Sequence, residues 1–349
     1  MNRSRTAGSS PLPRTTIRSR TLRVVRRYGR LGGGAVILAV LTWRFGTGPF
    51  LDGLGAVDGR SLAAAAGIGF VATCCCAWRW RLVGHGLGVK VPLPTAISAY
   101  YRSQFLNMTL PGGVLGDVHR GLRHGRDVGD VGKNLRAVAW ERGAGQGVQV
   151  IVTILVLLIF PSAVRGYMPV VAVLVVTGFL LAVVLANRLS HGTPSPLRRV
   201  LRAAAADIRG GLLEPRAWPG ITLASIVVVA GHTTTFLIAA RAVGATSTVL
   251  TLVPLALLAL AAMSVPINIG GWGPREGVAA WAFAASGLGA AQGVTTAVVY
   301  GVLGFVATLP GAVVLVVEQF HRAPHRAAGA GSVGQPDPAL VGPEAHHGG

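Results

Sequence analysis

The stretch LPGGVLGDVHR, residues 110–120, stands between long apolar runs and decides how this chain can fold. Its proline and glycines break helices, and its charged residues Asp117 and Arg120 are costly against lipid. Non-helical backbone is tolerated at membrane depth only where it is buried in protein or lines a wet cavity. If the surrounding runs cross a membrane, this stretch should therefore lie in the protein interior.

The composition indicates that the apolar runs do cross a membrane. Of the 349 residues, 51% are hydrophobic and 13% are charged, whereas a soluble domain has about 25% charged residues. We expect an all-α fold, a polytopic transmembrane helical bundle of about six to eight spans with one or two re-entrant hairpins that contain proline and glycine. The apolar segments lie near 31–50, 61–78, 93–111, 137–160, 167–187, 219–240, 247–265, 277–290 and 293–317.

Basic segments give the expected topology. The chain has 32 Lys and Arg against 12 Asp and Glu, a net charge of +20. The positive-inside rule places the four basic segments 1–30, 79–90, 119–136 and 188–216 on the cytoplasmic side. Both flanks of 92–118 are then inside, which a single crossing cannot satisfy. We therefore predict that this segment is a re-entrant hairpin and that both chain termini are cytoplasmic.

The two ends of the chain differ from the apolar part. Residues 1–30 hold nine arginines and no acidic residue, and the chain from about His321 onward is rich in Ala, Gly, Pro and His. We expect a basic disordered cytoplasmic tail over 1–30, one transmembrane domain over 31–320 and a disordered tail over 321–349. A signal peptide also begins with a basic region and an apolar run, but no small-residue cleavage site follows, so we expect an uncleaved first span.

A second stretch, PINIGGWGPREG at 266–277, partly repeats the first. Aligned on their prolines, the two read Pro111-x4-Gly116-x3-Arg120 and Pro266-x4-Gly271-x3-Arg275. Paired segments interrupted by Gly and Pro mark the substrate site in many transporters. The match is short, so a true internal repeat and a chance match both stay open. For 247–290, a re-entrant hairpin and two short spans also both stay open. If this segment is a hairpin that enters from outside, the two halves have opposite orientations.

Acidic residues near the apolar segments are the other indication of a site. An unpaired charge at membrane depth costs several kcal/mol, so such residues pair, face a cavity or lie at the interface. Asp117 and Arg120 can pair across one helical turn, whereas the neighbours Glu141 and Arg142 point apart. An exchange across the hairpins, Arg275 with Glu141 or Arg120 with Glu276, would supply partners. The alternative is that all six charged residues, the three acids and the three arginines beside them, anchor the chain at the headgroup level.

The residue types of both stretches favour an anionic ligand. Guanidinium groups bind phosphate in a bidentate manner, and glycine-rich turns expose backbone N–H groups that also favour anions. The polar residues Ser103, Gln104, Asn107 and Thr109 before the first turn fit a cavity wall better than lipid. The ligand indicated is a lipid with a phosphate group, either a phospholipid or a polyprenyl phosphate.

Four motifs in order resemble a known family. They are SQFLNMTLPGGVLGDVHR at 103–120, WERGAGQ at 140–146, VPINIGGWGPREG at 265–277 and TLPG at 308–311. Together they resemble the membrane domain of lysylphosphatidylglycerol synthases and the flippase-like integral membrane proteins that share it. The resemblance covers roughly residues 30–320 and implies an α-helical bundle in the cytoplasmic membrane. In the synthases this domain is associated with moving the aminoacylated lipid between leaflets.

The resemblance also implies which residues form the site. The positions that would bind lipid phosphate or line the cavity are Asn107, Pro111, Gly112, Gly116, Asp117, Arg120, Glu141, Arg142, Gly270, Gly271, Gly273, Arg275 and Glu276. Pro310 and Gly311 carry over as structural positions, and we assign Pro266 a structural role as well. The synthases carry a soluble aminoacyl-transferase domain after the membrane part, whereas 29 residues follow Phe320 here. We therefore expect no synthesis of lysyl-lipid by this chain.

Sequence signatures of other functions are missing. No P-loop, HExxH or GxSxG motif occurs, and Cys74, Cys75 and Cys76 are adjacent and form no zinc-ligand pattern. We expect no cofactor, no metal site and no catalytic residue, and no nucleic-acid partner, because no nucleic-acid-binding motif accompanies the basic charge. His232, beside three threonines in an apolar run, is either a proton relay or a hydrogen-bonded packing residue.

These observations favour a multi-pass protein of the cell membrane that binds a phosphate-bearing lipid and translocates it between leaflets. A membrane-embedded transferase with a lipid-phosphate donor and a carboxylate base is one alternative. A non-catalytic membrane partner of a lipid-modifying enzyme is the other. A transferase needs a carboxylate available to act as a base, whereas a translocator needs only a wet groove lined with charge.

Overall fold

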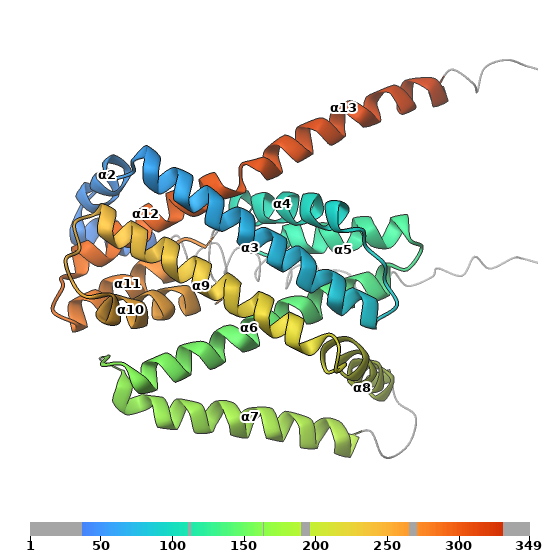
Figure 1. Cartoon of the computed structure of the whole chain (residues 1–349), viewed down its shortest axis with the longest axis horizontal. Coiled ribbons are helices and arrows are strands. Elements are labelled where there is room, and N and C mark those ends of the chain that lie inside the picture. Colours follow the sequence, from blue (N-terminus) through green and yellow to red (C-terminus); the bar gives the residue numbers. More distant parts are fainter. Residues whose placement is uncertain (1–36, 111–112, 163, 190–195, 265–270, 331–349) are drawn as a thin grey trace, which may run out of the picture.

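The chain forms a bundle of α-helices (Figure 1). The computed structural model describes residues 37–110, 113–162, 164–189, 196–264 and 271–330, and these residues form no β-strand. The predicted all-α fold is thereby confirmed. After a helix over 37–45 come α2 Gly48–Gly55, α3 Gly59–Gly86, α4 Leu93–Thr109, α5 Leu115–Asp127, α6 Val131–Ile159, α7 Met168–Leu189, α8 Pro196–Asp207, α9 Trp218–Ala242, α10 Val249–Ala262, α11 Pro274–Ala285, α12 Ala290–Thr308 and α13 Pro310–Ala330.

Four helical segments in the described ranges are long and apolar enough to cross a membrane. They are α3, α6, α9 and the combined run Ala290–Phe320 of α12 and α13. Shorter apolar helices occupy Arg165–Gly178 and Val249–Ala262. The chain is therefore a multi-pass membrane protein. The predicted basic tail over 1–30 lies outside the described residues.

Capping residues set where the long helices begin. Asp58 and Ser61 form a reciprocal capping box at the start of α3, and the Asp130 side chain accepts from the Lys133 N–H at the start of α6. Each cap satisfies backbone N–H groups that have no partner within the helix. In α4, α9 and α11 a proline stands in the first turn, where its missing N–H costs nothing.

Helices α3 and α9 pack against each other and run in opposite directions. Gly220, near the start of α9, contacts Trp78 and Leu82 near the end of α3. Gly231, half-way along α9, contacts Ile68 in the first half of α3. The end of α3 and the end of α9 therefore lie at opposite ends of the bundle, as Figure 1 shows.

The predicted re-entrant hairpin at 92–118 is present as the pair α4 and α5. Six residues separate α3 from α4 and three separate α5 from α6, and both legs open at the same end of the bundle (Figure 1). At 17 and 13 residues, the legs are roughly 25 and 20 Å long, shorter than the hydrocarbon core of about 30 Å. The hairpin therefore turns inside the bundle.

Residues 249–285 form a second helical hairpin, the pair α10 and α11. It follows the end of α9 and precedes α12, so it enters from the opposite end of the bundle to the first hairpin. Its legs have 14 and 12 residues, again too short to cross. Of the two arrangements left open for 247–290, the structure has the hairpin, and the two halves have opposite orientations.

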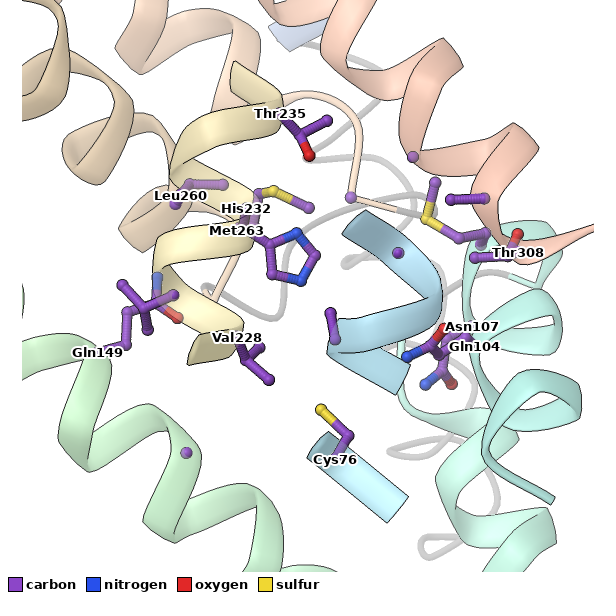
Figure 2. Close-up of a pocket in the computed structure, with 18 of the residues that line it drawn as sticks. Cys76, Gln104, Asn107, Gln149, Val228, His232, Thr235, Leu260, Met263 and Thr308 are labelled. Atoms are coloured by element: carbon purple, nitrogen blue, oxygen red, sulfur yellow. The ribbon is translucent and has the colours of Figure 1, made fainter. Parts of the chain in front are cut away.

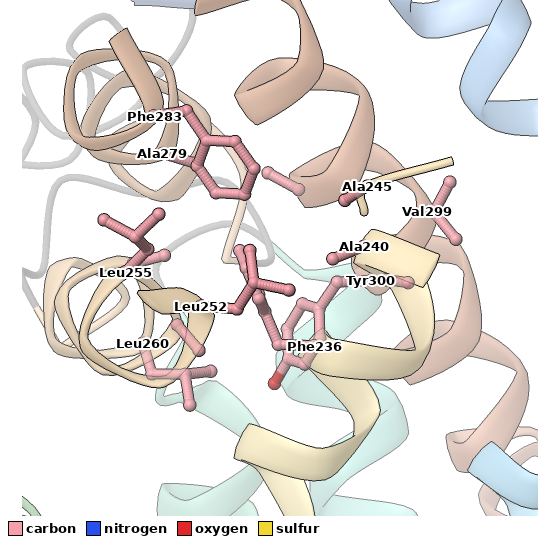
Figure 3. Close-up of a cluster of buried hydrophobic side chains, with 14 of the residues drawn as sticks. Phe236, Ala240, Ala245, Leu252, Leu255, Leu260, Ala279, Phe283, Val299 and Tyr300 are labelled. Carbon is pink, nitrogen blue, oxygen red and sulfur yellow. The ribbon is translucent and has the colours of Figure 1, made fainter. Parts of the chain in front are cut away.

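The largest apolar core holds the second hairpin in place (Figure 3). Phe236 of α9, Leu252 of α10, Phe283 of α11 and Tyr300 of α12 meet there, and all four are buried. Gly293 lets α12 approach the backbone of α11 closely, because a Cβ at this position would collide with the Ala279 carbonyl. This packing fixes α10 and α11 against α9 and α12.

Three predicted boundaries differ from the helix bounds in the structure. The segment predicted as one span at 31–50 is interrupted after residue 45, where Gly46 has a φ of 75°, in the left-handed region that favours glycine. The predicted basic loop over 79–90 is largely helical, because α3 continues to Gly86 and buries Arg79. Helix α13 extends to Ala330, so its last ten residues lie within the predicted tail over 321–349.

Candidate functional site

Close packing at Gly116 holds the two legs of the first hairpin together. A Cβ at Gly116 would collide with the carbonyl oxygen of Ser103 on α4, so only glycine fits there. The Gly116 N–H donates to the Asn107 side-chain oxygen at 2.8 Å. The start of α5 is thereby fixed against the end of α4, which brings the next residue, Asp117, to the α4 surface.

Asp117 is buried and accepts hydrogen bonds from four side chains. Ser103 donates at 3.0 Å and Asn107 at 2.7 Å. Arg120 donates at 3.0 Å from one turn further along α5, as predicted, and Arg142 of α6 completes the set. The carboxylate thus joins α4, α5 and α6.

Glu141 forms a second junction and is fully buried. Its Oε1 accepts from Arg79 of α3 at 2.6 and 2.9 Å and from the Tyr100 hydroxyl of α4 at 2.7 Å. Its Oε2 accepts from Arg120 at 3.1 Å. Arg79 also donates to Ser225 of α9 at 2.9 Å. One carboxylate therefore connects α3, α4, α5 and α6, and through Arg79 also α9.

Arg120 lies between two aromatic rings in the protein interior. Its guanidinium carbon is 4.5 Å from the centre of the Trp80 ring and 4.0 Å from that of Tyr100, distances at which a cation is attracted to a ring face. The side chain is fully buried. Arg120 therefore stabilises the hairpin from behind the cavity wall.

The second hairpin carries its own ion pair. Arg275 donates to the adjacent Glu276 carboxylate, with Nε at 2.9 Å, and the second carboxylate oxygen accepts from the Gly273 N–H at 2.7 Å. Gly271 and Gly273 have φ values of 89° and 105°, in the left-handed region that favours glycine. These two glycines let the chain turn sharply into the first turn of α11, where both charged residues sit.

Arg275 also lies against two aromatic rings. Its guanidinium carbon is 4.8 Å from the Trp272 ring centre and 5.2 Å from that of Tyr300 on α12. The side chain is fully buried, and its Nη1 has no hydrogen-bond partner among the described residues. A buried polar atom without a partner is costly, which makes this nitrogen a candidate contact for a ligand.

Both hairpins contribute to one cavity of about 340 Å³ (Figure 2). From the first half Asn107, Gly113, Asp117 and Arg142 line it. From the second half come Gly271 and Arg275, and α9 adds His232. Arg142 has a side chain that is 36% exposed. Apolar and small side chains of α3, α9 and α12 complete the wall.

The predicted site residues thus fall into three groups. Asn107, Asp117, Arg142, Gly271 and Arg275 line the cavity. Arg120, Glu141 and Glu276 are buried behind its wall and form ion pairs within the protein. Gly116, Gly273 and Gly311 serve backbone packing and turns, with Gly311 against the Tyr101 carbonyl and Pro310 at the first position of α13. Pro111, Gly112, Pro266 and Gly270 lie outside the described residues.

The expected exchange of ion pairs across the hairpins is not what the structure has. Arg120 pairs with Asp117 and Glu141, and Arg275 pairs with Glu276. The two helical hairpins enter the bundle from opposite ends, so each arginine meets the carboxylates of its own half first. Of the four polar residues expected on the cavity wall, Gln104 and Asn107 line it. Thr109 bonds the Phe105 carbonyl, and Ser103 bonds Asp117.

Sequence reasoning misses Arg79 and Tyr100, both of which hold Glu141. Counting charges assigns Arg79 to a basic loop, because three basic residues occur within 79–90. One signal points the other way: the sequence after Arg79 stays largely apolar and contains no proline before Pro92. That pattern favours one long helix that carries Arg79 within it. In the described part of the chain, no cluster of three His, Cys, Asp or Glu side chains could hold a metal ion.

A bundle of apolar helices with two opposed hairpins around a charged cavity defines an integral membrane protein. The chain matches the family described as "Lysylphosphatidylglycerol synthase TM region" over residues 29–311. Because this match covers most of the chain, the protein belongs to that family, and the resemblance seen in the four motifs is confirmed. Searches of curated proteins and of solved structures give no match.

Proposed function

We propose that this protein binds a lipid that carries a phosphate group and moves it between the leaflets of the cell membrane. The observation that carries this proposal is Arg275, which is fully buried at the wall of a cavity in the bundle and has one terminal nitrogen without a partner among the described residues. A guanidinium with an available N–H suits a phosphate oxygen, because the interaction is charge-assisted.

The charges of the two halves support an anionic ligand. Four arginines, Arg79, Arg120, Arg142 and Arg275, face three carboxylates, those of Asp117, Glu141 and Glu276. Among these seven groups one positive charge has no counter-charge. Uncompensated charge inside a membrane protein is costly, and a ligand with one negative charge would compensate it.

The helix ends at the cavity add to this preference. The two hairpins direct the N-termini of α5 and α11 toward the middle of the bundle. A helix N-terminus carries a partial positive charge that favours anions. Half-helices whose N-termini face an anionic group at the membrane midplane are a recurrent feature of secondary transporters.

The lipid part of the ligand is supported by the family and by the cavity wall. The wall combines the charged groups with apolar residues such as Ile68, Val228 and Leu260, which suits an amphiphile better than a soluble ion. We place the protein in the cell membrane with both termini in the cytoplasm, because the basic segments at 119–136 and 188–216 then lie inside.

The transferase alternative is less well supported. A general base must have a carboxylate available to take a proton. Glu141 accepts from two arginines and a tyrosine, Asp117 from two arginines and two neutral donors, and Glu276 from Arg275 and a backbone N–H. Each of these carboxylates is already engaged by arginine and other donors within the protein. We therefore propose no enzymatic activity and no cofactor.

Leaflet exchange in liposomes tests the function. The purified protein is reconstituted with fluorescent phosphatidylglycerol or a fluorescent polyprenyl phosphate, and the outer-leaflet label is quenched chemically at intervals. The native protein should accelerate exchange of at least one lipid. Arg275→Lys keeps the charge but not the planar fork, and should slow exchange about tenfold, as expected for one lost charge-assisted hydrogen bond of roughly 1.4 kcal/mol.

Two further variants separate a lost ligand contact from a lost fold. The double variant Arg275→Met with Glu276→Gln removes both charges of the pair, so no unpaired charge stays buried. It should purify as a folded protein and exchange no lipid above the rate of protein-free liposomes. Arg60→Ala, an exposed residue at the start of α3 outside the cavity lining, should exchange lipid at the native rate. A fully active double variant would contradict the proposal.

A further inference from the structure

His232 lies near the middle of the spanning helix α9 and faces the cavity. Figure 2 shows its ring pointing into the open space, between Val228 and Met263. Although it sits well inside the bundle, the residue is exposed to the cavity. Its hydrogen bond to Tyr300 fits the packing role, whereas the open space in front of its ring fits the proton relay.

Tyr300 connects His232 to Arg275. The tyrosine hydroxyl and the His232 Nδ1 are 2.9 Å apart, a hydrogen bond between α12 and α9. The same tyrosine ring lies 5.2 Å from the Arg275 guanidinium carbon. Tyr300 is buried within the apolar core, so it holds a fixed position. One buried side chain therefore lies beside both the imidazole and the arginine that is proposed to bind phosphate.

The other helices packed on α9 contribute few groups that could titrate beside His232. Into the cavity α3 directs Cys76 and Arg79, and α6 directs Arg142. Helix α12 contributes Tyr300, and α10 contributes no titratable side chain to the described lining. Arg275 of α11, Tyr100 of α4 and Asp117 of α5, which is paired with two arginines, also line the cavity. Arginine keeps its charge at all ordinary pH values, and histidine is the residue type whose charge ordinarily changes between pH 5 and 8.

We propose that lipid translocation is coupled to a proton, that His232 carries this proton, and that Tyr300 is the positioning residue that orients the imidazole. This inference rests on the proposed function. With the Nδ1–H donating to the Tyr300 oxygen, Nε2 takes up the proton from water in the cavity. The imidazolium and Arg275 then both attract the anionic headgroup. Because binding is reciprocal, a bound anion favours the proton to the same extent.

Coupling changes what drives transport. One proton moves with each headgroup of one negative charge, so the translocated pair carries no net charge. The membrane potential then does not act on the pair, and the pH difference alone sets the direction. When the lipid leaves on the less acidic side, the imidazole gives its proton back to water. The site without lipid then returns to the first side with an uncharged His232.

The experiment measures the steady distribution of lipid across a pH difference. Liposomes that contain the native protein and fluorescent phosphatidylglycerol are clamped at zero potential with potassium and valinomycin. The outside is made about one pH unit more acidic, and lumenal pyranine records proton entry. One proton per lipid predicts about a tenfold excess of label in the inner leaflet. His232→Gln should lower this ratio to about one, and Tyr300→Phe should give an intermediate ratio.

The outcomes separate this inference from the proposed function. Exchange by the native protein with a ratio near one and no proton entry would overturn coupling and leave translocation standing. A tenfold ratio retained in His232→Gln would overturn the role of His232. No exchange at any pH would overturn the proposed function, and coupling with it. His85→Gln, which changes an exposed histidine at the end of α3 outside the cavity lining, should keep the native ratio.

Discussion

The two hairpins are alike in shape but hold their arginines in different ways. In the first hairpin Arg120 is bound by carboxylates from α5 and α6 and lies between rings from α3 and α4. In the second hairpin Arg275 pairs with the adjacent Glu276 and lies against Trp272, a residue of its own turn. Only the Tyr300 ring comes from another described helix.

This difference indicates a division of labour. The first hairpin is tied to the bundle by bonds that cross four helices, so its arginine has a structural role. The second hairpin satisfies its charges within five residues, from Trp272 to Glu276. Both arginines keep a terminal nitrogen without a hydrogen-bond partner among the described residues, but of the two only Arg275 lines the cavity. Anchoring in one half and ligand contact in the other is the arrangement that the following predictions test.

The largest effect is expected when the carboxylates are neutralised one at a time. Glu141→Gln leaves Arg79 and Arg120 buried with less compensation, and breaking a buried pair of this kind costs about 3–5 kcal/mol. Glu276→Gln breaks one local pair beside a cavity that water can enter, and should cost about 1–3 kcal/mol. The free energy of unfolding is measured by SDS titration in mixed micelles. Equal losses in the two variants would remove the distinction between the halves.

An intermediate effect is expected from adding one methyl group to each half. In Gly116→Ala the Cβ meets the Ser103 backbone, which cannot move away without opening the hairpin, and overpacking of this kind costs about 1–3 kcal/mol. In Gly301→Ala the Cβ meets the side chains of Arg275 and Trp272. These can shift, so lipid exchange should fall several-fold, on the order of one lost hydrogen bond, while the unfolding free energy changes little.

Two glycines provide matched controls for this comparison. A Cβ added at Gly147 in α6 or at Gly304 in α12 would point into open space, so alanine fits at both positions. Gly147→Ala and Gly304→Ala should be neutral or slightly stabilising, because alanine favours the helix. If Gly301→Ala unfolds the protein as readily as Gly116→Ala, then the second half is anchored as firmly as the first.

The smallest effect concerns how the helix after each hairpin begins. The hydrogen bond from the Lys133 N–H holds the pKa of Asp130 below its usual value, whereas the N-cap residue of α12, Gly289, provides no side-chain cap. A lowered pKa in the folded state means that the stabilisation is present above the unfolded-state pKa, near 3.9, and is lost as the pH falls through the folded-state value. Native protein should therefore lose stability relative to Asp130→Asn between about pH 5 and 3 in unfolding scans. A constant difference across that range would contradict this assignment.

Much of the fold could be predicted from local sequence. Apolar length predicted most helices, and basic residues on both sides of 92–118 predicted a hairpin without any knowledge of its packing. The Asp117–Arg120 pair followed from helical spacing alone. The sequence left open whether 247–290 is a hairpin of reversed orientation. One hairpin and two short spans both leave the C-terminus on the same side of the membrane, so counting crossings does not separate them.

The partners of Glu141 could not be predicted in this way. Arg79 and Arg120 are 62 and 21 residues away in sequence, and only the crossing of α3, α5 and α6 brings them together. Counting basic residues by segment even placed Arg79 outside the membrane. Charge clusters therefore predict topology well where the helix ends, but not where a helix continues through the cluster, as α3 does to Gly86.

The wall of the cavity on α12 has a mechanical consequence. Gly301, Gly304 and Ala307 stand on the cavity side of this helix, and Gly69 and Ala72 of α3 line the same cavity. None of these five side chains is larger than a methyl group, so the cavity wall has low relief at these positions. A hydrocarbon chain of the proposed lipid would meet only small groups there, whereas Ile68 and Leu303 of the same two helices present branched side chains to the rest of the cavity.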